Sequence, residues 1–275
     1  MNRIDATFAR CKSVQRAALI PYVTAGDPSL AVMPAMLDSL VAAGADVIEL
    51  GVPFSDPMAD GPVIQRASER ALARGVSLSD VLDLVAQFRR KNTTTPIVLM
   101  GYANPIEAMG TQSFAERSAR AGVDGVLVVD YPPEEAESFA RLLIEHAIAP
   151  IFLLSPTTST QRMQAIALLA RGYVYYVSLK GVTGAAHIDT ADVAVNVAQI
   201  RRHVELPVGV GFGIRDAASA RAIAQHADAV VIGSRLIQEI ESAPPGEAPA
   251  RAGAWLASIR AALDSLSTAR SPAAV

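Results

Sequence analysis

The sequence predicts a single-domain (β/α)8 barrel of the α/β class, a TIM barrel, on three observations. Short runs rich in Val, Ile, Leu and Tyr recur along the whole chain, and stretches with the apolar spacing of helices lie between them. Eight such strand and helix pairs fill the 275 residues, which is the number that a barrel needs. A doubly wound open sheet usually has fewer strands, so the barrel is the better interpretation.

The eight expected strands are short and apolar. In chain order they are Ala18–Thr24, Val47–Leu50, Ile97–Met100, Gly125–Asp130, Ile151–Leu154, Tyr173–Leu179, Val208–Gly211 and Ala229–Ile232. Because side chains alternate between the faces of a strand, Tyr173 and Tyr175 share one face. Val47 and Glu49 share a face of their strand for the same reason. Strands that alternate with helices form one parallel sheet.

The helices between these strands have recognisable boundaries. The expected helical segments begin at Pro28-Ser29, with Gly44 near the end of the first, and at Ser77–Asp80, and further ones cover Thr111–Ala121 and Gln161–Ala170. Proline or serine at the start and glycine just past the end are the usual signals of helix termini.

Helical segments outside the repeating units are expected near both ends. One over Ile4–Arg10 would cover the bottom of the barrel, and a short one over Arg235–Ile240 follows strand eight. Ser242–Gly253, rich in proline and glycine, is expected to be a flexible connection before a last amphipathic helix over Trp255–Leu266. We therefore expect residues 1–270 to form one domain and residues 271–275 a frayed tail.

Composition excludes several classes of protein. The net charge is −3 and no basic cluster exceeds Arg89-Arg90-Lys91, which argues against a nucleic-acid surface, and a charged fraction of 19% argues against disorder. The single cysteine, Cys11, rules out an internal disulfide, and the four histidines are too scattered for metal ligation, so we expect no metal. Since no apolar run approaches about 18 residues and the first residues lack a secretory signal, we expect a cytoplasmic protein.

The most informative segment is Ile48–Gly61, in which an apolar strand ends on Glu49 and a loop then carries Asp60. Burial at the strand end would raise the pKa of Glu49 towards neutrality. Pro53 and Pro57 stiffen the loop, so two carboxylates would be held ready for acid and base catalysis on a small substrate. An ordinary strand-end glutamate with a solvated loop would give the same pattern, so other motifs must decide.

The active site of such a barrel lies at the carboxyl ends of the strands. The residues expected at those ends are Tyr22, Glu49, Met100, Val129, Leu153, Tyr175, Phe212 and Ile232. A pocket with apolar and aromatic walls and few charges suits a flat, uncharged ring. The alternative for these side chains is plain filling of the barrel, which spacing alone does not exclude.

Glycines after strands seven and eight indicate a phosphate site. Gly211 and Gly213 end strand seven, and Gly233 and Ser234 precede the short extra helix. Glycines let backbone N–H groups approach a phosphate, and a helix N-terminus adds a favourable dipole. These two loops form the phosphate site of many barrels.

A third motif, Leu179–His187, follows strand six and predicts a mobile lid of small residues. Gly184 in this loop would add a backbone donor to the phosphate. Thr183 would hydrogen-bond Asp60 across the mouth and hold the catalytic loop in place.

These motifs resemble the tryptophan synthase α-subunit family along nearly the whole chain. The resemblance lies in Tyr22–Pro28, Ile48–Gly61, Met100–Pro105, Gly181–Gly184, and the glycine motifs 211–213 and 233–234, in order and with matching spacing. Family members often carry Phe at position 22 and Leu at position 100, and the lid often has Arg-Ala where Lys180 stands here. These departures concern packing and the lid.

The resemblance implies retro-aldol cleavage of indole-3-glycerol phosphate to indole and glyceraldehyde 3-phosphate. Glu49 would protonate indole C3 and serve as base for the side-chain hydroxyl, and Asp60 would accept a hydrogen bond from the indole N–H. It implies that the ring is sandwiched by Tyr22, Met100, Leu127, Tyr175, Phe212 and Ile232. It implies that Gly184, Gly213, Gly233 and Ser234 hold the phosphate.

The resemblance also implies a partner. Family members pair with a β subunit that binds pyridoxal phosphate, in an α2β2 heterotetramer, so this chain would need no cofactor of its own. The apolar loop Pro53–Met58 would meet that partner through Phe54 and Asp56. The loop could equally fold onto its own barrel.

Three other functions are compatible with parts of the sequence. Lys180, just past a strand end, could form a Schiff base in an aldolase of a different mechanism. The chain could instead be a phosphate-binding regulatory subunit with slow chemistry of its own. A free-standing lyase that releases indole is the third alternative, and the loop Pro53–Pro57 does not exclude it.

Overall fold

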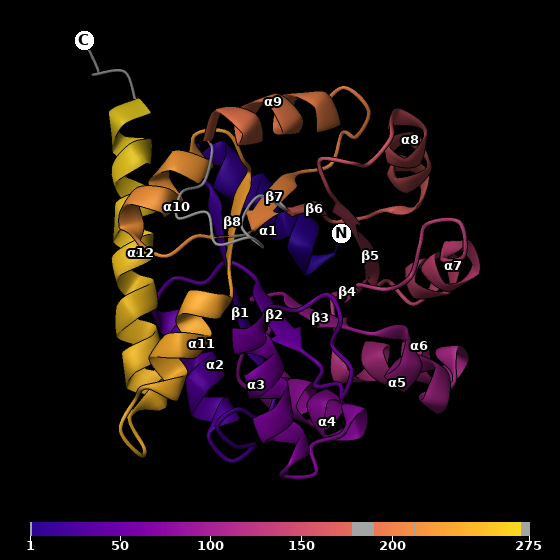
Figure 1. The fold of residues 1–275 in the computed structure, drawn as a ribbon, viewed down its shortest axis with the longest axis vertical. Coiled ribbons are helices and arrows are strands. Elements are labelled where there is room, and N and C mark those ends of the chain that lie inside the picture. Colours follow the sequence, from indigo (N-terminus) through magenta and orange to yellow (C-terminus); the bar gives the residue numbers. More distant parts are fainter. Residues whose placement is uncertain (1, 178–189, 212, 271–275) are drawn as a thin grey trace.

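In the computed structural model the strands close into a barrel surrounded by helices (Figure 1). The structure describes residues 2–177, 190–211 and 213–270, and for residues 267–270 it describes the backbone alone. Within the described residues, eight strands pair in chain order and β8 pairs with β1 to close the barrel. Every neighbouring pair is parallel, so the predicted fold class is confirmed.

The strands lie close to their expected positions. Their bounds are β1 Ala18–Thr24, β2 Ile48–Gly51, β3 Ile97–Gly101, β4 Gly125–Val128, β5 Ala149–Leu154, β6 Val174–Val177, β7 Val208–Gly211 and β8 Ala229–Ile232. The expected bounds of β1, β7 and β8 are confirmed, and the others differ at one or both ends. The register aligns Tyr22 of β1 with Glu49 of β2, and Glu49 with Val98 of β3.

The helices cover the outside of the barrel and close one end. Their bounds are α1 Arg3–Ser13, α2 Met33–Ala42, α3 Pro62–Leu72, α4 Leu78–Arg89, α5 Ala103–Met109, α6 Thr111–Ala121, α7 Glu137–Glu145, α8 Thr160–Leu169, α9 Thr190–Ile200, α10 Ala217–Ala224, α11 Ser234–Glu241 and α12 Ala248–Arg270. Two helices stand between β2 and β3, and two between β3 and β4. Helices α3, α5, α7, α9 and α10 have no counterpart among the individual helical segments expected from the sequence.

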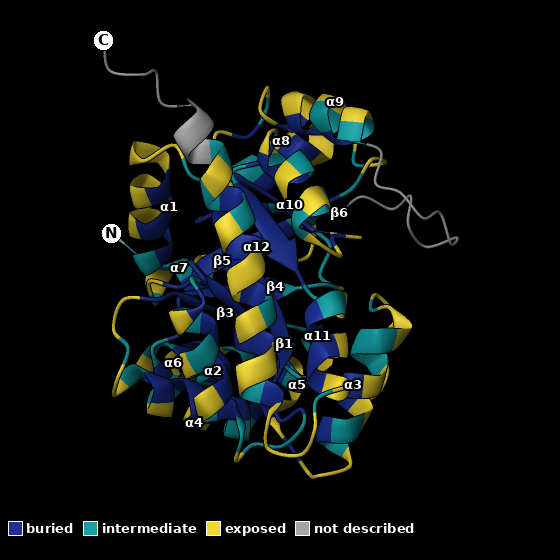
Figure 2. Cartoon of the chain, turned by 90° about the vertical axis from the view of Figure 1, so that its left-hand side faces the viewer, coloured by how far each residue is buried: buried dark blue, intermediate teal, exposed yellow. Residues whose placement is uncertain are grey.

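Side chains from alternate strand positions fill the barrel interior. Ile20, Val98, Ile151, Tyr173 and Val231 belong to one buried cluster inside the barrel. A second, larger cluster lies between the strands and the helices that cover them. Figure 2 shows the same division, with buried residues on the strands and the inner helix faces and exposed residues on the outer helix faces.

Helix α1 closes the bottom of the barrel, as the sequence predicts. Its buried residues Ile4, Phe8 and Cys11 join the interior cluster, and the Phe8 ring lies 5.6 Å from the ring of Tyr173. Asn2 caps the helix by accepting a hydrogen bond from the backbone N–H of Ile4. The amphipathic spacing of this helix therefore serves the barrel interior.

The first barrel helix begins later than expected. Turns formed by hydrogen bonds from Val32 N to Ser29 O and from Met33 N to Leu30 O precede α2, which begins at Met33. The helix-start signal at Pro28-Ser29 instead begins these turns. Pro34 stands in the first turn of α2, where its missing N–H leaves no hydrogen bond unmade.

The expected flexible connection at Ser242–Gly253 is wrong in its second half. Helix α12 already begins at Ala248 and contains Gly253, against which the backbone of Ser39 in α2 packs. The Ser39 hydroxyl donates to the carbonyl of Pro249 at 2.6 Å. Glycine at position 253 therefore serves close packing of two helices, which the local sequence does not reveal.

Two further findings concern the described residues as a whole. Among them, no helix combines the length and apolar character that a membrane crossing requires. Within the same part of the chain, no group of histidine, cysteine, aspartate or glutamate side chains is arranged to hold a metal ion. The tail at 271–275 lies outside the described residues.

Candidate active site

Glu49 lies fully buried on β2 and points into the upper part of the barrel. Its alternation with Val47, an interior residue, and its 0% exposure put the carboxylate inside the mouth. The Tyr173 hydroxyl donates to Glu49 Oε1 at 2.5 Å, and Oε2 accepts no hydrogen bond from the described residues. Burial raises the pKa of Glu49 to about 7, against the lowering effect of Tyr173.

Asp60 lies in the loop that follows β2, just before α3. The Tyr102 hydroxyl donates to Asp60 Oδ2 at 2.9 Å, and the same hydroxyl accepts from the backbone N–H of Ala59 at 3.0 Å. Gln65 of α3 donates its side-chain amide to the Asp60 carbonyl at 2.8 Å. Burial raises the pKa of Asp60 to about 6, although the Tyr102 hydrogen bond lowers it.

Two tyrosines lie within electrostatic reach of both carboxylates. The negative charges of Glu49 and Asp60 each raise the pKa of Tyr22 and of Tyr175, after burial, which is the larger cause. Tyr22 is aligned with Glu49 in the register of β1 and β2, and Tyr175 shares a strand face with Tyr173, the hydrogen-bond donor to Glu49. Apolar and aromatic side chains therefore surround Glu49, and two acids of different pKa suit proton exchange with a group bound near them.

Glycines of β2 and β7 make room for these two rings. A Cβ on Gly51 would overlap the Tyr22 hydroxyl, and a Cβ on Gly211 would overlap the Tyr175 hydroxyl. Gly211, which we expect to support the site, therefore leaves the space that the Tyr175 ring occupies. Gly51 plays the matching part for Tyr22.

The remaining expected wall residues fall into three groups. Leu127 belongs to the interior cluster, and Met100 packs against it. Val129 and Leu153 pack against the same cluster. Phe212 lies outside the described residues. Tyr175 likewise packs against the interior cluster, whereas Tyr22 belongs to the cluster between strands and helices but is aligned with Glu49 in the register of β1 and β2.

Ile232 does not lie in the interior cluster. It belongs to the cluster between strands and helices, whereas its neighbour Val231 belongs to the interior cluster and pairs with Gly211. Side chains alternate along β8, so a one-residue difference exchanges the two faces of the strand. The geometry therefore assigns the wall position on β8 to Val231 and corrects the expectation for Ile232.

Two of the four expected phosphate residues, Gly233 and Ser234, lie at the N-terminus of α11, and Gly213 follows β7. Gly233 is the N-cap, Ser234 is the first helical residue, and neither the side chain of Ser234 nor any other caps the helix. Gly213 has a φ of +69°, in the region that favours glycine. The first N–H groups of α11 are thus free of side-chain caps within the described residues. Thr183, Gly184 and Lys180 lie outside the described residues.

Sequence reasoning missed Tyr102 and Tyr173, which hold the two carboxylates. Thr183, the expected partner of Asp60, lies outside the described residues, and among the described residues Tyr102 is the side chain that donates to the Asp60 carboxylate. A buried carboxylate requires a hydrogen-bond donor, so a search for tyrosines near both acids could have found them. Tyr173 directly precedes β6 and shares a face with Tyr175, and Tyr102 follows the end of β3.

The loop between Glu49 and Asp60 folds partly onto its own barrel. The Phe54 ring lies 5.1 Å from the ring of Tyr102, and the side chain is partly buried. Asp56 is exposed and accepts a hydrogen bond from Ser55 at 2.5 Å, and Met58 is 84% exposed. One side of the loop thus supports Tyr102, and the other side faces outwards.

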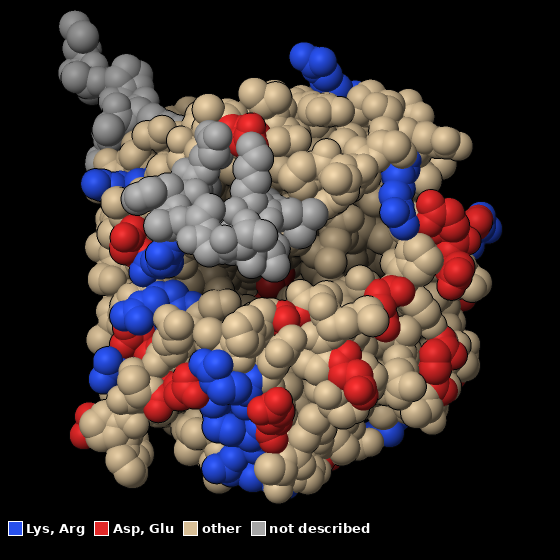
Figure 3. Space-filling view, in the orientation of Figure 1, with Lys and Arg blue, Asp and Glu red and all other residues tan. Residues whose placement is uncertain are grey.

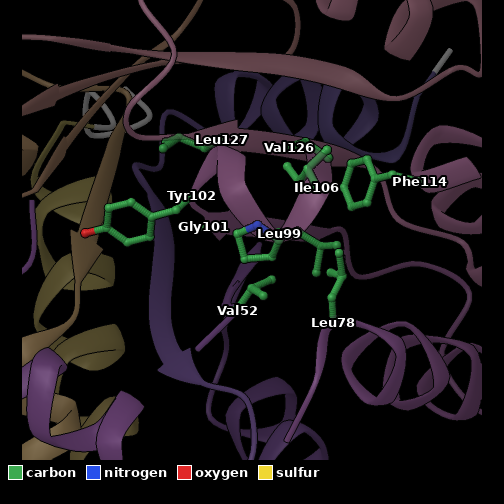
Figure 4. Close-up of a pocket in the computed structure, with 10 residues that line it drawn as sticks. Val52, Leu78, Leu99, Gly101, Tyr102, Ile106, Phe114, Val126 and Leu127 are labelled. Carbon is green, nitrogen blue, oxygen red and sulfur yellow. The ribbon is translucent and has the colours of Figure 1, made fainter. Parts of the chain in front are cut away.

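An apolar cavity lies behind this loop, on the outer side of β3 and β4 (Figure 4). Its walls include Val52, Leu99, Ile106, Phe114 and Val126. Figure 4 shows the Tyr102 hydroxyl directed away from the side chains of Ile106 and Phe114. The Tyr102 side chain therefore lines this apolar cavity, while its hydroxyl donates to Asp60.

Comparisons with known proteins agree with this geometry. A family model described as "Tryptophan synthase alpha chain" matches residues 8–258. The tryptophan synthase alpha chain of Bordetella bronchiseptica is 61% identical to this chain, and the match covers 99% of both chains. That of Laribacter hongkongensis is 62% identical, and the match covers 96% of this chain and 100% of the relative.

Solved structures agree as well. Tryptophan synthase subunit alpha from Legionella pneumophila superposes with a TM-score of 0.91 at 45% identity, over 96% of this chain and 99% of that chain. A chain of tryptophan synthase from M. tuberculosis, in an aminoacrylate-bound form, superposes with a TM-score of 0.85 at 34% identity, over 96% of this chain and 100% of that chain. The chain belongs to the tryptophan synthase alpha chain family.

Proposed function

We propose that this chain cleaves indole-3-glycerol phosphate to indole and glyceraldehyde 3-phosphate, the α reaction of tryptophan biosynthesis. One observation carries the proposal most strongly: the buried Glu49 and the partly buried Asp60, with pKa values raised to about 7 and about 6, lie at one end of a barrel whose interior is apolar and aromatic. A flat ring fits such a mouth, and carboxylates that titrate near neutrality suit proton transfer to and from it.

Glu49 performs the proton transfers in this proposal. Its acid form delivers a proton to indole C3, because the ring cannot leave as a bare carbanion. Its carboxylate form removes the proton of the adjacent side-chain hydroxyl. The C3 side-chain bond then breaks, its electron pair restores the aromatic ring, and the hydroxyl carbon becomes the aldehyde of glyceraldehyde 3-phosphate. A pKa of about 7 makes both forms of Glu49 available near neutrality.

Asp60 stabilises the charge that this step creates. Protonation at C3 places positive charge on the ring, and the ring N–H then becomes a stronger hydrogen-bond donor. The Asp60 carboxylate, held by Tyr102, accepts that hydrogen bond. A pKa of about 6 leaves Asp60 mostly ionised at neutral pH, which is the state that an acceptor requires.

The phosphate of the substrate binds at the far side of the mouth in this proposal. Gly233 and Ser234 supply backbone N–H groups and a hydroxyl at the N-terminus of α11, and Gly213 after β7 and Gly184 each supply another N–H. Binding energy from the phosphate positions the remote bond that breaks. Tyr22, Met100, Leu127, Tyr175 and Phe212 wall the ring, with Val231 on β8.

We further propose an α2β2 heterotetramer with a β subunit that holds pyridoxal phosphate, while this chain itself holds no cofactor. Membership of the family supports a β-subunit partner. In this proposal the loop meets the β subunit through the exposed Asp56 and Met58 and the partly buried Phe54, next to the mouth where indole would leave. We place the reaction in the cytoplasm, and the free thiol of Cys11 suits a reducing compartment.

The decisive experiment measures indole release from indole-3-glycerol phosphate by the purified chain, alone and with a β subunit. The proposal expects turnover in both cases. Turnover by the chain alone that borohydride stops by trapping an adduct would instead favour the Schiff-base mechanism at Lys180. Absence of indole in both cases, with substrate still bound, would favour a regulatory subunit.

A further inference from the structure

Arg70 connects three parts of the barrel mouth through one guanidinium. On helix α3, its Nε and Nη2 donate to the two carboxylate oxygens of Asp27, each at 2.8 Å, in a bidentate pair. Its Nη1 donates to Glu241 Oε1, also at 2.8 Å. Asp27 is 2% exposed, in the loop after β1, and Glu241 is the last residue of α11. Bidentate pairs of this kind fix geometry as well as charge.

Each of the three elements leads to a different part of the site. Helix α3 begins at Pro62, directly after Asp60 and Gly61, and its Gln65 holds the Asp60 carbonyl. Helix α11 begins at Ser234, in the proposed phosphate site. The β1 loop continues from the strand that carries Tyr22. Arg70 is thus linked, through the elements that it connects, to Asp60, to the proposed phosphate site and to Tyr22.

The same three elements also pack directly against one another. Helix α3 contacts both α11 and β1, and α11 contacts β1, as their neighbouring positions in Figure 1 indicate. Ile64 of α3 lies within van der Waals distance of a Cβ placed on Gly233, and Val76 lies against Gly26 in the β1 loop. Basic and acidic side chains stand side by side over α3 in Figure 3. A change in the tilt of α3 would therefore move Asp60 relative to the phosphate site.

We propose that Arg70 is a positioning residue for the proposed reaction, which sets the distance between Asp60 and the phosphate-binding end of α11. The inference rests on the proposed function. Arginine is required because its planar fork reaches Asp27 with two nitrogens and Glu241 with the third. Lysine would keep the charge but could not hold both partners in fixed directions.

The chain offers a matched control at the opposite end of the barrel. Arg89 of α4 donates from Nη2 to Asp124 Oδ2 at 2.5 Å, and Asp124 is 3% exposed. Asp124 directly precedes β4, so this pair lies at the N-terminal ends of the strands, far from the mouth. Both arginines bind a buried aspartate from a helix, but only Arg70 contacts elements that carry proposed site residues.

The experiment compares Arg70→Lys with Arg89→Lys and the natural chain, using indole-3-glycerol phosphate turnover and binding of glycerol 3-phosphate. We expect both variants to lose thermal stability. We expect Arg70→Lys alone to raise KM about 5- to 20-fold and to weaken glycerol 3-phosphate binding by a similar factor, since a displaced ligand group commonly costs on this scale. Arg89→Lys should stay within about twofold of the natural chain.

A second variant covers the case in which Arg70→Lys does not fold. Glu241→Gln leaves the Arg70 pair with Asp27 intact and weakens the links from α3 to α11, which Arg70 makes at 2.8 Å and Arg66 at 3.6 Å. It should raise KM and weaken glycerol 3-phosphate binding several-fold with kcat almost unchanged. Equal KM and equal binding in the Arg70, Glu241 and Arg89 variants would overturn the role of Arg70.

The proposed function is judged separately, by the natural chain. A natural chain that releases no indole refutes the proposed function. In that event glycerol 3-phosphate binding still decides whether Arg70 positions the end of α11. A natural chain that is active, beside an Arg70→Lys variant with unchanged KM and binding, refutes only the inference about Arg70.

Discussion

At the scale of single residues, burial rather than charge pairing sets the chemistry of the mouth. Glu49 and Asp60 each have one tyrosine hydroxyl as a hydrogen-bond donor, and for both the desolvation effect on the pKa exceeds the effect of that donor. No arginine or lysine among the described residues forms an ion pair with either carboxylate. The pKa values therefore rise into the range that proton transfer at neutral pH requires.

Exchange of each carboxylate for its amide tests the two roles. Glu49→Gln should bind substrate but lose turnover by about a thousandfold or more, because an amide cannot transfer the protons. Asp60→Asn should lose less, because its amide oxygen still accepts a hydrogen bond. Single-turnover kinetics and substrate binding measure both effects. Substantial turnover by Glu49→Gln would remove that residue from the proton transfer, and an equal or larger loss in Asp60→Asn would show that charge matters more.

The pH dependence of kcat/KM should be bell-shaped. Activity should rise as Asp60 ionises near pH 6 and fall as Glu49 loses its proton near pH 7, if the acid form of Glu49 is required first. Tyr102→Phe removes the hydrogen bond that lowers the pKa of Asp60, so the acidic limb should move to higher pH by about half to one unit. Tyr176→Phe, a buried tyrosine in the outer cluster, is the control. An unchanged acidic limb in Tyr102→Phe would contradict this assignment.

The raised pKa of Glu49 also predicts how stability depends on pH. Because the folded chain holds this proton more tightly than the unfolded chain, the stability contribution is present below pH 4.5 and declines up to pH 7. Glu49→Gln removes the cost of burying the anion. At pH 8 its free energy of unfolding, measured by urea denaturation, should therefore exceed that of the natural chain by about 1–3 kcal/mol. The difference should vanish near pH 4. A variant less stable at pH 8 would show that the unpaired amide dominates.

At the scale of elements, single glycines decide how closely strands and helices approach. Gly51 and Gly211 admit the rings of Tyr22 and Tyr175, and Gly253 admits the backbone of Ser39. A sequence pattern identifies a glycine but does not say what it makes room for. That is why Gly253 was assigned to a flexible connection although it lies inside α12.

Gly253→Ala tests the packing of α12 on α2. Alanine favours a helix by about 1 kcal/mol over glycine, but its Cβ would lie 3.3 Å from the Ser39 carbonyl oxygen and overlap the hydroxyl. We expect a net loss of about 1–2 kcal/mol in the free energy of unfolding, measured by urea denaturation. Ala254→Ser, at an exposed position on the same helix, should change stability by less than about 0.5 kcal/mol. Stabilisation by Gly253→Ala would mean that helix propensity outweighs the close contact.

At the scale of the whole molecule, the barrel order brings the site together. Glu49, Asp60 and Ser234 are separated along the chain but lie at the same end of the barrel, since parallel strands share their carboxyl ends. We propose residues 1–270 as one domain, because the interior cluster draws on strands from β1 to β8.

Assembly with a β subunit is the prediction at this scale. Light scattering of an equimolar mixture should give the mass of two copies of each chain. Asp56→Arg should weaken assembly about tenfold or more, because it reverses a charge on the exposed side of the loop. Glu134→Arg, an exposed acid on another loop, is the control. Equal assembly by both variants would place the interface elsewhere.

The sequence by itself determined the barrel, the two carboxylates and the glycine loops, because these depend on periodicity, chain order and turn residues along the chain. The tertiary structure alone decided which donors hold the acids and which face of β8 lines the mouth. Tyr173 lies 124 positions from Glu49, and Tyr102 lies 42 from Asp60. Such contacts depend on closure of the barrel and on strand register. On β8 a shift of one residue decides whether a side chain faces the barrel interior, as Val231 does, or the surrounding helices, as Ile232 does.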